Sequence, residues 1–198
     1  MNQLSKFKMQ LDSLHEALMG IMAVYYFLVP NNEYEKTDPH FILTTNEAIK
    51  LVIGRIITLI NDKKDRKFNT ISFKILIDDI ISNIGQLDDM ESKLDCFKEL
   101  LKIIENIDDK YKTFRDKVAF HIELGEQNKL KGYKDYSLSN NEITKLLETA
   151  IYLYDRLFFL LADSGTDHMK EDLEALSCRV WEAYEKLGIV RRNNLNPE

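Results

Sequence analysis

The sequence contains few of the residues that interrupt or cross-link a small fold: three prolines, seven glycines and two cysteines in 198 residues. Because prolines and glycines break regular structure, their scarcity favours long helices over many short strands. A secreted domain held together by disulfides would need more cysteines, and Cys96 and Cys178 lie far apart in the sequence. We therefore expect both cysteines to be reduced thiols.

The sequence also lacks a long hydrophobic run. The longest, residues 17–29, spans thirteen residues, whereas a transmembrane helix needs about 20. The N-terminus does not show the short apolar core and small-residue cleavage site of a secretory signal. These two absences predict a cytoplasmic protein without a membrane partner.

Motifs of several enzyme classes are missing as well. None of the glycines precedes a Lys-Ser or Lys-Thr pair, as in a phosphate-binding loop, and no two histidines have the spacing of a zinc site. Asp12 and His15 share one helix face without further ligands that the sequence identifies, so a surface or packing role is expected for them. We expect no cofactor and no metal ion.

What remains is the composition of a globular protein, with 44% hydrophobic and 30% charged residues. Its net charge of −6 argues against a surface that coats nucleic acid throughout, although it permits a local basic site. Most tyrosines and phenylalanines fall on apolar helical stripes. They are therefore predicted to be core residues rather than a platform for stacked bases.

Apolar residues recur every three or four positions, which places them on one face of a helix. Such series run over residues 4–28, 44–60, 72–84, 90–104, 107–122, 140–161 and 173–187. Because each stripe must be buried against a neighbour, the sequence predicts an all-α fold, an antiparallel helical bundle of six to seven helices. We expect a single domain over residues 1–188 and a flexible C-terminal tail over residues 189–198.

Polar residues indicate where several of these helices begin. Thr44 with Glu47 three positions later has the pattern of a capping box, and Ser72 is placed to cap the next helix. Ser139 or Asn140 opens the helix after the lysine-rich loop. The stripe of the last helix is predicted to comprise Leu173, Leu176, Val180, Tyr184 and Leu187.

The strongest candidate site lies in residues 115–121. In an ideal helix, Arg115 and His121 point about 120° apart and lie about 9 Å apart along the axis, with Val118 midway between them. The two polar side chains would then flank an apolar ridge. On a two-fold axis, that ridge would bring the Arg and His of both copies into one cleft.

This pair of residue types suits RNA cleavage without a metal ion. Near neutral pH, His121 can take the proton of a 2′-hydroxyl or protonate the leaving oxygen. Arg115 stays charged and offers a planar fork of donors to phosphate. Asp116 can orient that fork or its partner across the interface, and Lys117 is a candidate for substrate binding. DNA lacks the 2′-hydroxyl, so this chemistry selects RNA. The alternative is an arginine and a histidine with a structural role in a core or an interface.

At these residues, the stretch Phe114-Arg-Asp-Lys-Val-Ala-Phe-His121 resembles the HEPN superfamily of small helical nucleases. Its motif is Arg, then Asn, Asp or His, then three to five residues and His. Arg115, Asp116 and His121 match all three motif positions. The stretch looks like the branch named for a phage abortive-infection protein, and residues 48–77 are similar to that branch in pattern. The similarity covers about two thirds of the chain.

The resemblance implies a HEPN-like helical bundle, a homodimer with the motif at its interface, and metal-independent endoribonuclease activity. In this family the histidine is the acid and base, and the arginine stabilises the phosphate. Members often act as toxins or in phage defence, sometimes with a nucleotidyltransferase-like antitoxin, which is a candidate partner here. Glu123 departs from the tyrosine of the antitoxin-modified toxins.

Two alternatives to the nuclease follow. Many HEPN members have lost activity, so the chain is alternatively a non-catalytic helical interaction protein or an RNA- or nucleotide-binding protein of the same fold. Binding of a nucleotide or small ligand in a cavity of the bundle is the third hypothesis.

Overall fold

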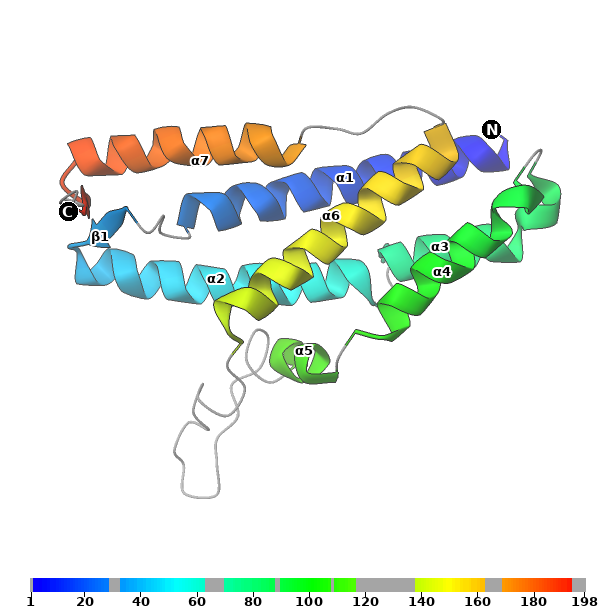
Figure 1. Ribbon diagram of the computed structural model, residues 1–198, viewed down its shortest axis with the longest axis horizontal. Coiled ribbons are helices and arrows are strands. Elements are labelled where there is room, and N and C mark those ends of the chain that lie inside the picture. The colour runs from blue at the N-terminus through cyan, green and yellow to red at the C-terminus, as the bar shows by residue number, and fades with distance from the viewer. Residues whose placement is uncertain are drawn as a thin grey trace, which may run out of the picture. The chain divides into compact units, whose positions relative to one another are not determined.

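The computed structural model describes residues 2–28, 33–62, 70–87, 90–107, 109–116, 138–162 and 169–193. In this part of the chain there are seven α-helices, two short 3-10 helices and a pair of short strands (Figure 1). The predicted all-α helical bundle is thus confirmed. The helices are α1 (Gln3–Leu28), α2 (Pro39–Ile60), α3 (Phe73–Ser82), α4 (Leu94–Glu105), α5 (Asp109–Phe114), α6 (Asn140–Ala162) and α7 (Met169–Lys186).

The chain divides into two compact units, and each takes residues from separate parts of the sequence. The first unit comprises residues 1–18 and 53–167, and the second comprises residues 19–52 and 168–198. Helices α1 and α2 each have one end in the first unit and the other end in the second. The single domain over residues 1–188 stays a prediction.

The core of the first unit is built from the predicted stripes. In α6 the whole stripe is buried, namely Ile143, Leu147, Ala150, Tyr154, Leu157 and Leu161. Helices α3 and α4 lie side by side (Figure 1). The imidazole of His15, from α1, stacks on the ring of Tyr154 with 4.9 Å between centroids. Of the surface or packing role predicted for His15, the structure shows packing.

Two helices of the first unit begin at the serines that the sequence indicates. The backbone N–H of Ile75 donates to Ser72 Oγ at 3.2 Å, which caps α3. At the start of α6, the Ser139 backbone N–H and hydroxyl each donate to Glu142 Oε2 at 2.7 Å. The Glu142 N–H donates back to Ser139 Oγ at 3.3 Å. This is a complete capping box, so Ser139 is the residue that opens α6.

Helix α2 begins five positions before the predicted Thr44, at Pro39. The N–H groups of His40 and Phe41 donate to Asp38 Oδ1 at 2.8 and 3.1 Å. Asp38 satisfies two of the donors that a helix start leaves open, and proline suits the first position because it has no N–H. Thr44 lies inside the helix, where its hydroxyl donates to the His40 carbonyl at 2.8 Å. The predicted start at Thr44 was wrong because Asp38 caps the helix earlier.

In α7, within the second unit, the buried face differs from the predicted stripe. Leu173, Ser177 and Trp181 are buried, whereas Leu176 is 42% and Leu187 is 73% exposed. The buried residues follow one another at steps of four, so they share a face that is rotated away from Leu176. The prediction was wrong for Leu176 and Leu187 because burial of the large indole of Trp181 decides which face turns inward.

Trp181 is the centre of a cluster of aromatic side chains in the second unit. The Tyr34 ring stacks on the indole at 5.6 Å, and the rings of Phe41 and Tyr184 meet it edge-on at 5.9 and 5.6 Å. Val190 completes the buried part of this cluster. Offset-stacked and edge-on contacts are the arrangements that aromatic rings prefer, so this cluster is the core of the second unit.

Gly188 ends α7 and reverses the chain. Its N–H donates to the Glu185 carbonyl, and the next N–H, of Ile189, donates to the Tyr184 carbonyl, both at 3.0 Å. These two bonds form a Schellman motif, which needs a left-handed residue, and Gly188 has a φ of 72°. A residue with a side chain would be strained there.

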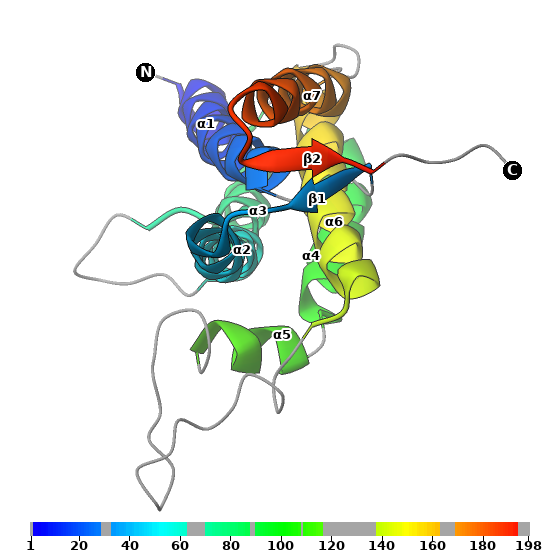
Figure 2. The ribbon, with the colours of Figure 1, turned by 90° about the vertical axis from the view of Figure 1, so that its left-hand side faces the viewer.

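The reversed chain forms strand β2 (Val190–Arg192), which pairs antiparallel with β1 (Tyr34–Lys36) (Figure 2). Val190 faces the aromatic cluster and is 1% exposed. Residues 190–192 therefore form a strand where the sequence predicts the start of a flexible tail. The pairing joins residues about 155 positions apart, which no local pattern indicates.

Candidate active site on helix α5

The predicted motif is described only in part. Arg115 and Asp116 lie among the described residues, directly after α5, whereas Lys117, Val118 and His121 lie outside them. The preceding residue, Phe114, has a fully buried side chain. This anchor fixes the end of α5 in the first unit, and with it the backbone that carries Arg115.

The Arg115 guanidinium is oriented by its neighbour. Arg115 Nε donates to Asp116 Oδ1 at 2.7 Å, and the Arg115 side chain is 20% exposed. No other side chain in the described part of the first unit bonds to this guanidinium. Its two terminal NH₂ groups are therefore available to a further acceptor, in the bidentate geometry that suits a phosphate.

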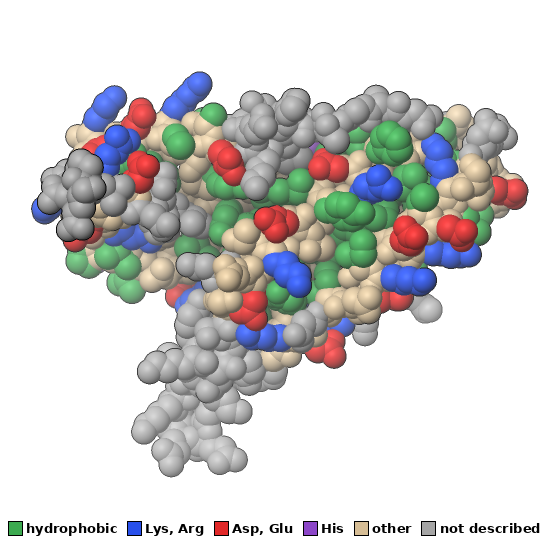
Figure 3. All heavy atoms as spheres, viewed as in Figure 1, with side chains coloured by type: hydrophobic (Ala, Val, Ile, Leu, Met, Phe, Trp, Pro, Cys, Tyr) green, Lys and Arg blue, Asp and Glu red, His purple; other side chains and the backbone are tan. Residues whose placement is uncertain are grey.

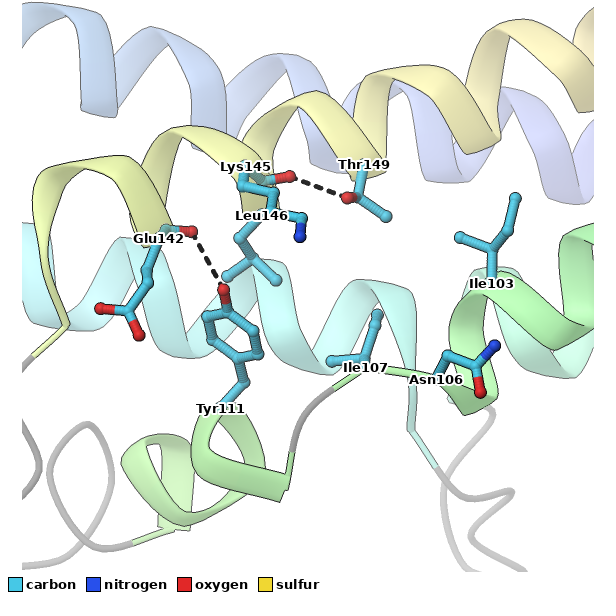
Figure 4. Close-up of a pocket in the computed structure, with 8 residues that line it drawn as sticks. All are labelled: Ile103, Asn106, Ile107, Tyr111, Glu142, Lys145, Leu146 and Thr149. Atoms are coloured by element: carbon cyan, nitrogen blue, oxygen red, sulfur yellow. Dashed lines mark hydrogen bonds between the residues drawn. The ribbon is translucent and has the colours of Figure 1, made fainter.

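One turn before Arg115, α5 contributes to a pocket of about 510 Å³ at the end of α4 and the start of α6 (Figure 4). Its lining combines apolar side chains with an amide, a hydroxyl, an ammonium group and a carboxylate. The lining residues are Ile103, Asn106, Ile107, Tyr111, Glu142, Lys145, Leu146 and Thr149. The volume of this pocket falls within the range of small-ligand sites.

Two contacts between α5 and α6 hold the pocket together. The Tyr111 hydroxyl donates to the Glu142 carbonyl at 3.4 Å, so the phenol ring forms one wall (Figure 4). Lys110 Nζ donates to Glu142 Oε1 at 2.7 Å. Tyr111 and Arg115 are four residues apart, about 6 Å along a helix axis. The backbone of Arg115 therefore lies about one helical turn beyond this wall of the pocket.

The charges around the pocket leave one cation in excess. The hydrogen bond from Lys110, with those from Ser139, lowers the pKa of Glu142 to about 2. Glu142 is therefore ionised at neutral pH, and Lys110 neutralises it. Lys145 has no ion-pair partner among the described residues. An anionic group in the pocket would thus meet an uncompensated ammonium group.

We expect the Glu142 contacts to make stability depend on pH in the acid range. The folded-state pKa of about 2 lies below the ordinary value of 4.5, so the stabilisation is present above pH 4.5 and is lost as pH falls towards 2. Because the ion pair is exposed, its contribution is below about 1 kcal/mol. Urea unfolding of the wild type should show this loss, and Glu142→Gln should lack it. The exposed Glu148→Gln serves as the control and should keep it.

The comparisons with known proteins are negative. No family model, curated protein or solved structure matches the chain. None of the helices in the described ranges combines the length and the apolar character that a bilayer span requires. The described residues also include no group of three or more His, Cys, Asp or Glu side chains arranged to hold a metal ion.

Sequence reasoning missed the pocket beside the motif. Tyr111 lies in the predicted apolar series over residues 107–122 and Glu142 was given no role, whereas both line the cavity. Lys145 gave no signal because an isolated lysine on a helix is ordinarily a solvated residue. The spacing of four between Tyr111 and Arg115 was the one local indication that they share a helix face.

Proposed function

We propose that the protein is a cytoplasmic, metal-independent endoribonuclease of the toxin or phage-defence type. It acts as a homodimer with Arg115 and His121 in a composite site at the interface. The observation that supports this most directly is the Arg115–Asp116 pair, in which a largely buried guanidinium keeps two NH₂ groups available. An antitoxin protein is a candidate partner.

In this proposal the histidines of the two copies share the proton transfers. One His121 takes the proton of a ribose 2′-hydroxyl, whose oxygen attacks the adjacent phosphorus. The bond from phosphorus to the 5′ oxygen breaks, and the other His121 protonates that leaving oxygen. The products are a 2′,3′-cyclic phosphate and a 5′-hydroxyl. Both histidines then exchange protons with water, so the reaction needs no metal ion and no oxidant.

Arg115 stabilises the charge that develops on the phosphate oxygens during this attack. Its Nε is held by Asp116, so the fork keeps one orientation and loses little entropy on binding phosphate. Lys117 adds a positive charge for the neighbouring phosphate. DNA lacks the 2′-hydroxyl and is therefore not cleaved by this mechanism.

The test is cleavage of RNA by the purified dimer in the presence of EDTA. Arg115→Ala should lower the rate by about 10²- to 10³-fold, as expected for loss of an oxyanion donor. Arg115→Lys should recover part of it, since the charge returns without the fork. Arg179→Ala, at an exposed arginine of α7, is the control and should leave the rate unchanged. Equal cleavage rates for Arg115→Ala and the control would show that Arg115 is not part of the active site.

The second candidate function is a non-catalytic, HEPN-like interaction protein that binds RNA or a nucleotide. The pocket supports it, because its volume falls within the range of small-ligand sites and its lining does not include His121. This candidate predicts RNA or nucleotide binding with no cleavage at any protein concentration.

A further inference from the structure

Helix α6 exposes two aromatic rings on the side opposite to its buried stripe. Tyr152 is 47% and Phe159 is 54% exposed, and neither lies on the predicted stripe of this helix. Arg156, between them in sequence, is exposed as well. At 100° per residue the three side chains fall within an arc of about 60°. They form one line along the helix, which we call the α6 row.

The α6 row alternates ring, cation and ring. Arg156 Cζ lies 6.0 Å from the centroid of the Phe159 ring, within the range of a cation–π contact. No carboxylate in the described part of the chain pairs with Arg156. In Figure 3, hydrophobic side chains flank a basic one where Figure 1 places the C-terminal half of α6.

The α6 row leads towards the pocket beside Arg115. Lys145 falls within the same arc, seven residues before Tyr152, and it lines the pocket. Figure 4 shows its ammonium group directed towards the space between Leu146 and Ile103. Tyr111 lies on the opposite side of this pocket, four residues before Arg115. The row, the pocket and the candidate active site thus follow one another within the first unit.

We propose that the α6 row and the pocket bind a segment of single-stranded RNA. Bases stack on Tyr152 and Phe159, Arg156 and Lys145 each meet a phosphate, and the strand runs past Tyr111 to Arg115. RNA as the ligand rests on the proposed function. The strand must be single because a duplex hides the faces of its bases within its own stack. Rings accept the face of every base, so this surface holds RNA without selecting a sequence.

A second protein chain is the other class of occupant, because tyrosine, phenylalanine and arginine are all enriched at protein interfaces. The other exposed residues of α6 in the described part are polar or charged, namely Asn141, Thr144, Lys145 and Glu148. Two rings with one cation between them, and a lysine further along the same arc, fit a single strand, whose bases stack on rings while its phosphates meet cations.

The experiment measures binding of a short labelled oligouridylate by fluorescence anisotropy, in EDTA and in a His121→Ala background that prevents cleavage. Tyr152→Ala and Phe159→Ala should each weaken binding about 5- to 150-fold, and Tyr152→Phe should retain it because the ring remains. Arg156→Ala should reduce the slope of log affinity against log salt by about 0.7, one phosphate contact. An RNA duplex should bind more weakly than the single strand.

The matched control is Met9→Ala, which removes a side chain of the same unit that is 57% exposed. It should bind as its parent does. Failure of the parent to bind, or unchanged affinity in both ring variants, would overturn the inference. Loss of self-association in the ring variants with unchanged RNA affinity would also overturn it and assign the row to a second copy.

Cleavage by the wild type is measured separately, so that the two proposals fail independently. Binding that depends on the two rings, without cleavage, would contradict the proposed nuclease activity and support the RNA-binding surface. Cleavage together with binding that does not depend on the rings would support the nuclease activity and contradict the RNA-binding surface.

Discussion

His121→Ala is expected to reduce RNA cleavage by about 10²- to 10⁴-fold, the range by which a positioned acid or base accelerates a reaction. The proposed site uses the imidazole of each copy, one as base and one as acid, so the single substitution removes both transfers. The measurement is the initial rate of cleavage of a labelled RNA in EDTA, with the dimer verified by sedimentation.

The control for this variant is His40→Ala, which removes an exposed histidine at the start of α2. It should cleave at the wild-type rate. Mixing His121→Ala subunits with Arg115→Ala subunits sharpens the test. If the site is composite, the mixed dimers should differ in rate from both parent variants. Wild-type activity in His121→Ala would rule out the proposed chemistry.

Trp181→Ala is expected to destabilise the protein by about 3–5 kcal/mol, the range for truncation of a buried aromatic residue. The indole is 1% exposed and contacts the rings of Tyr34, Phe41 and Tyr184. Its loss removes the centre of the second unit's core, and with it the packing behind the β1–β2 pair. Urea unfolding followed by circular dichroism gives the change in free energy.

Two further variants separate packing from other effects. Trp181→Phe should cost less than Trp181→Ala, because it keeps a ring and removes a buried indole N–H without a hydrogen-bond partner in the described part of the chain. Leu187→Ala, at a residue of the same unit that is 73% exposed, should change stability by less than about 0.5 kcal/mol. A cost for Leu187→Ala equal to that for Trp181→Ala would contradict the assigned core.

Local signals in the sequence were sufficient where one contact within a few residues decides the structure. Ser72 was recognised as a helix start and Ser139 as one of two candidates with Asn140, because a cap is formed with residues only three positions away. The start of α2 was missed because Thr44 and Asp38 both offer caps. The sequence pattern alone does not decide between these two caps. The hydrogen bonds from the N–H groups of His40 and Phe41 to Asp38 show that Asp38 is the cap.

In the candidate site, too, the local features were predicted and the contacts between distant segments were not. Arg115, Asp116 and His121 were recognised as a group because their spacing is local. Asp116 was expected to orient the guanidinium of Arg115 or its partner across the interface, and within one chain Arg115 Nε donates to Asp116 Oδ1. The pocket next to them was not foreseen, because it is formed by α4, α5 and α6, whose contributions lie up to 46 residues apart, from Ile103 to Thr149.

The sequence by itself determined the all-α class, the helix start at Ser72, that of α6 to within one residue, and the buried stripe of α6 with the exposed face opposite to it, because periodicity and capping act over a few residues. Only the tertiary structure decided that Trp181 faces inward and that residues 190–192 pair with β1. These outcomes depend on which distant segments meet, and burial of the largest apolar area selects among helix faces that look alike in sequence.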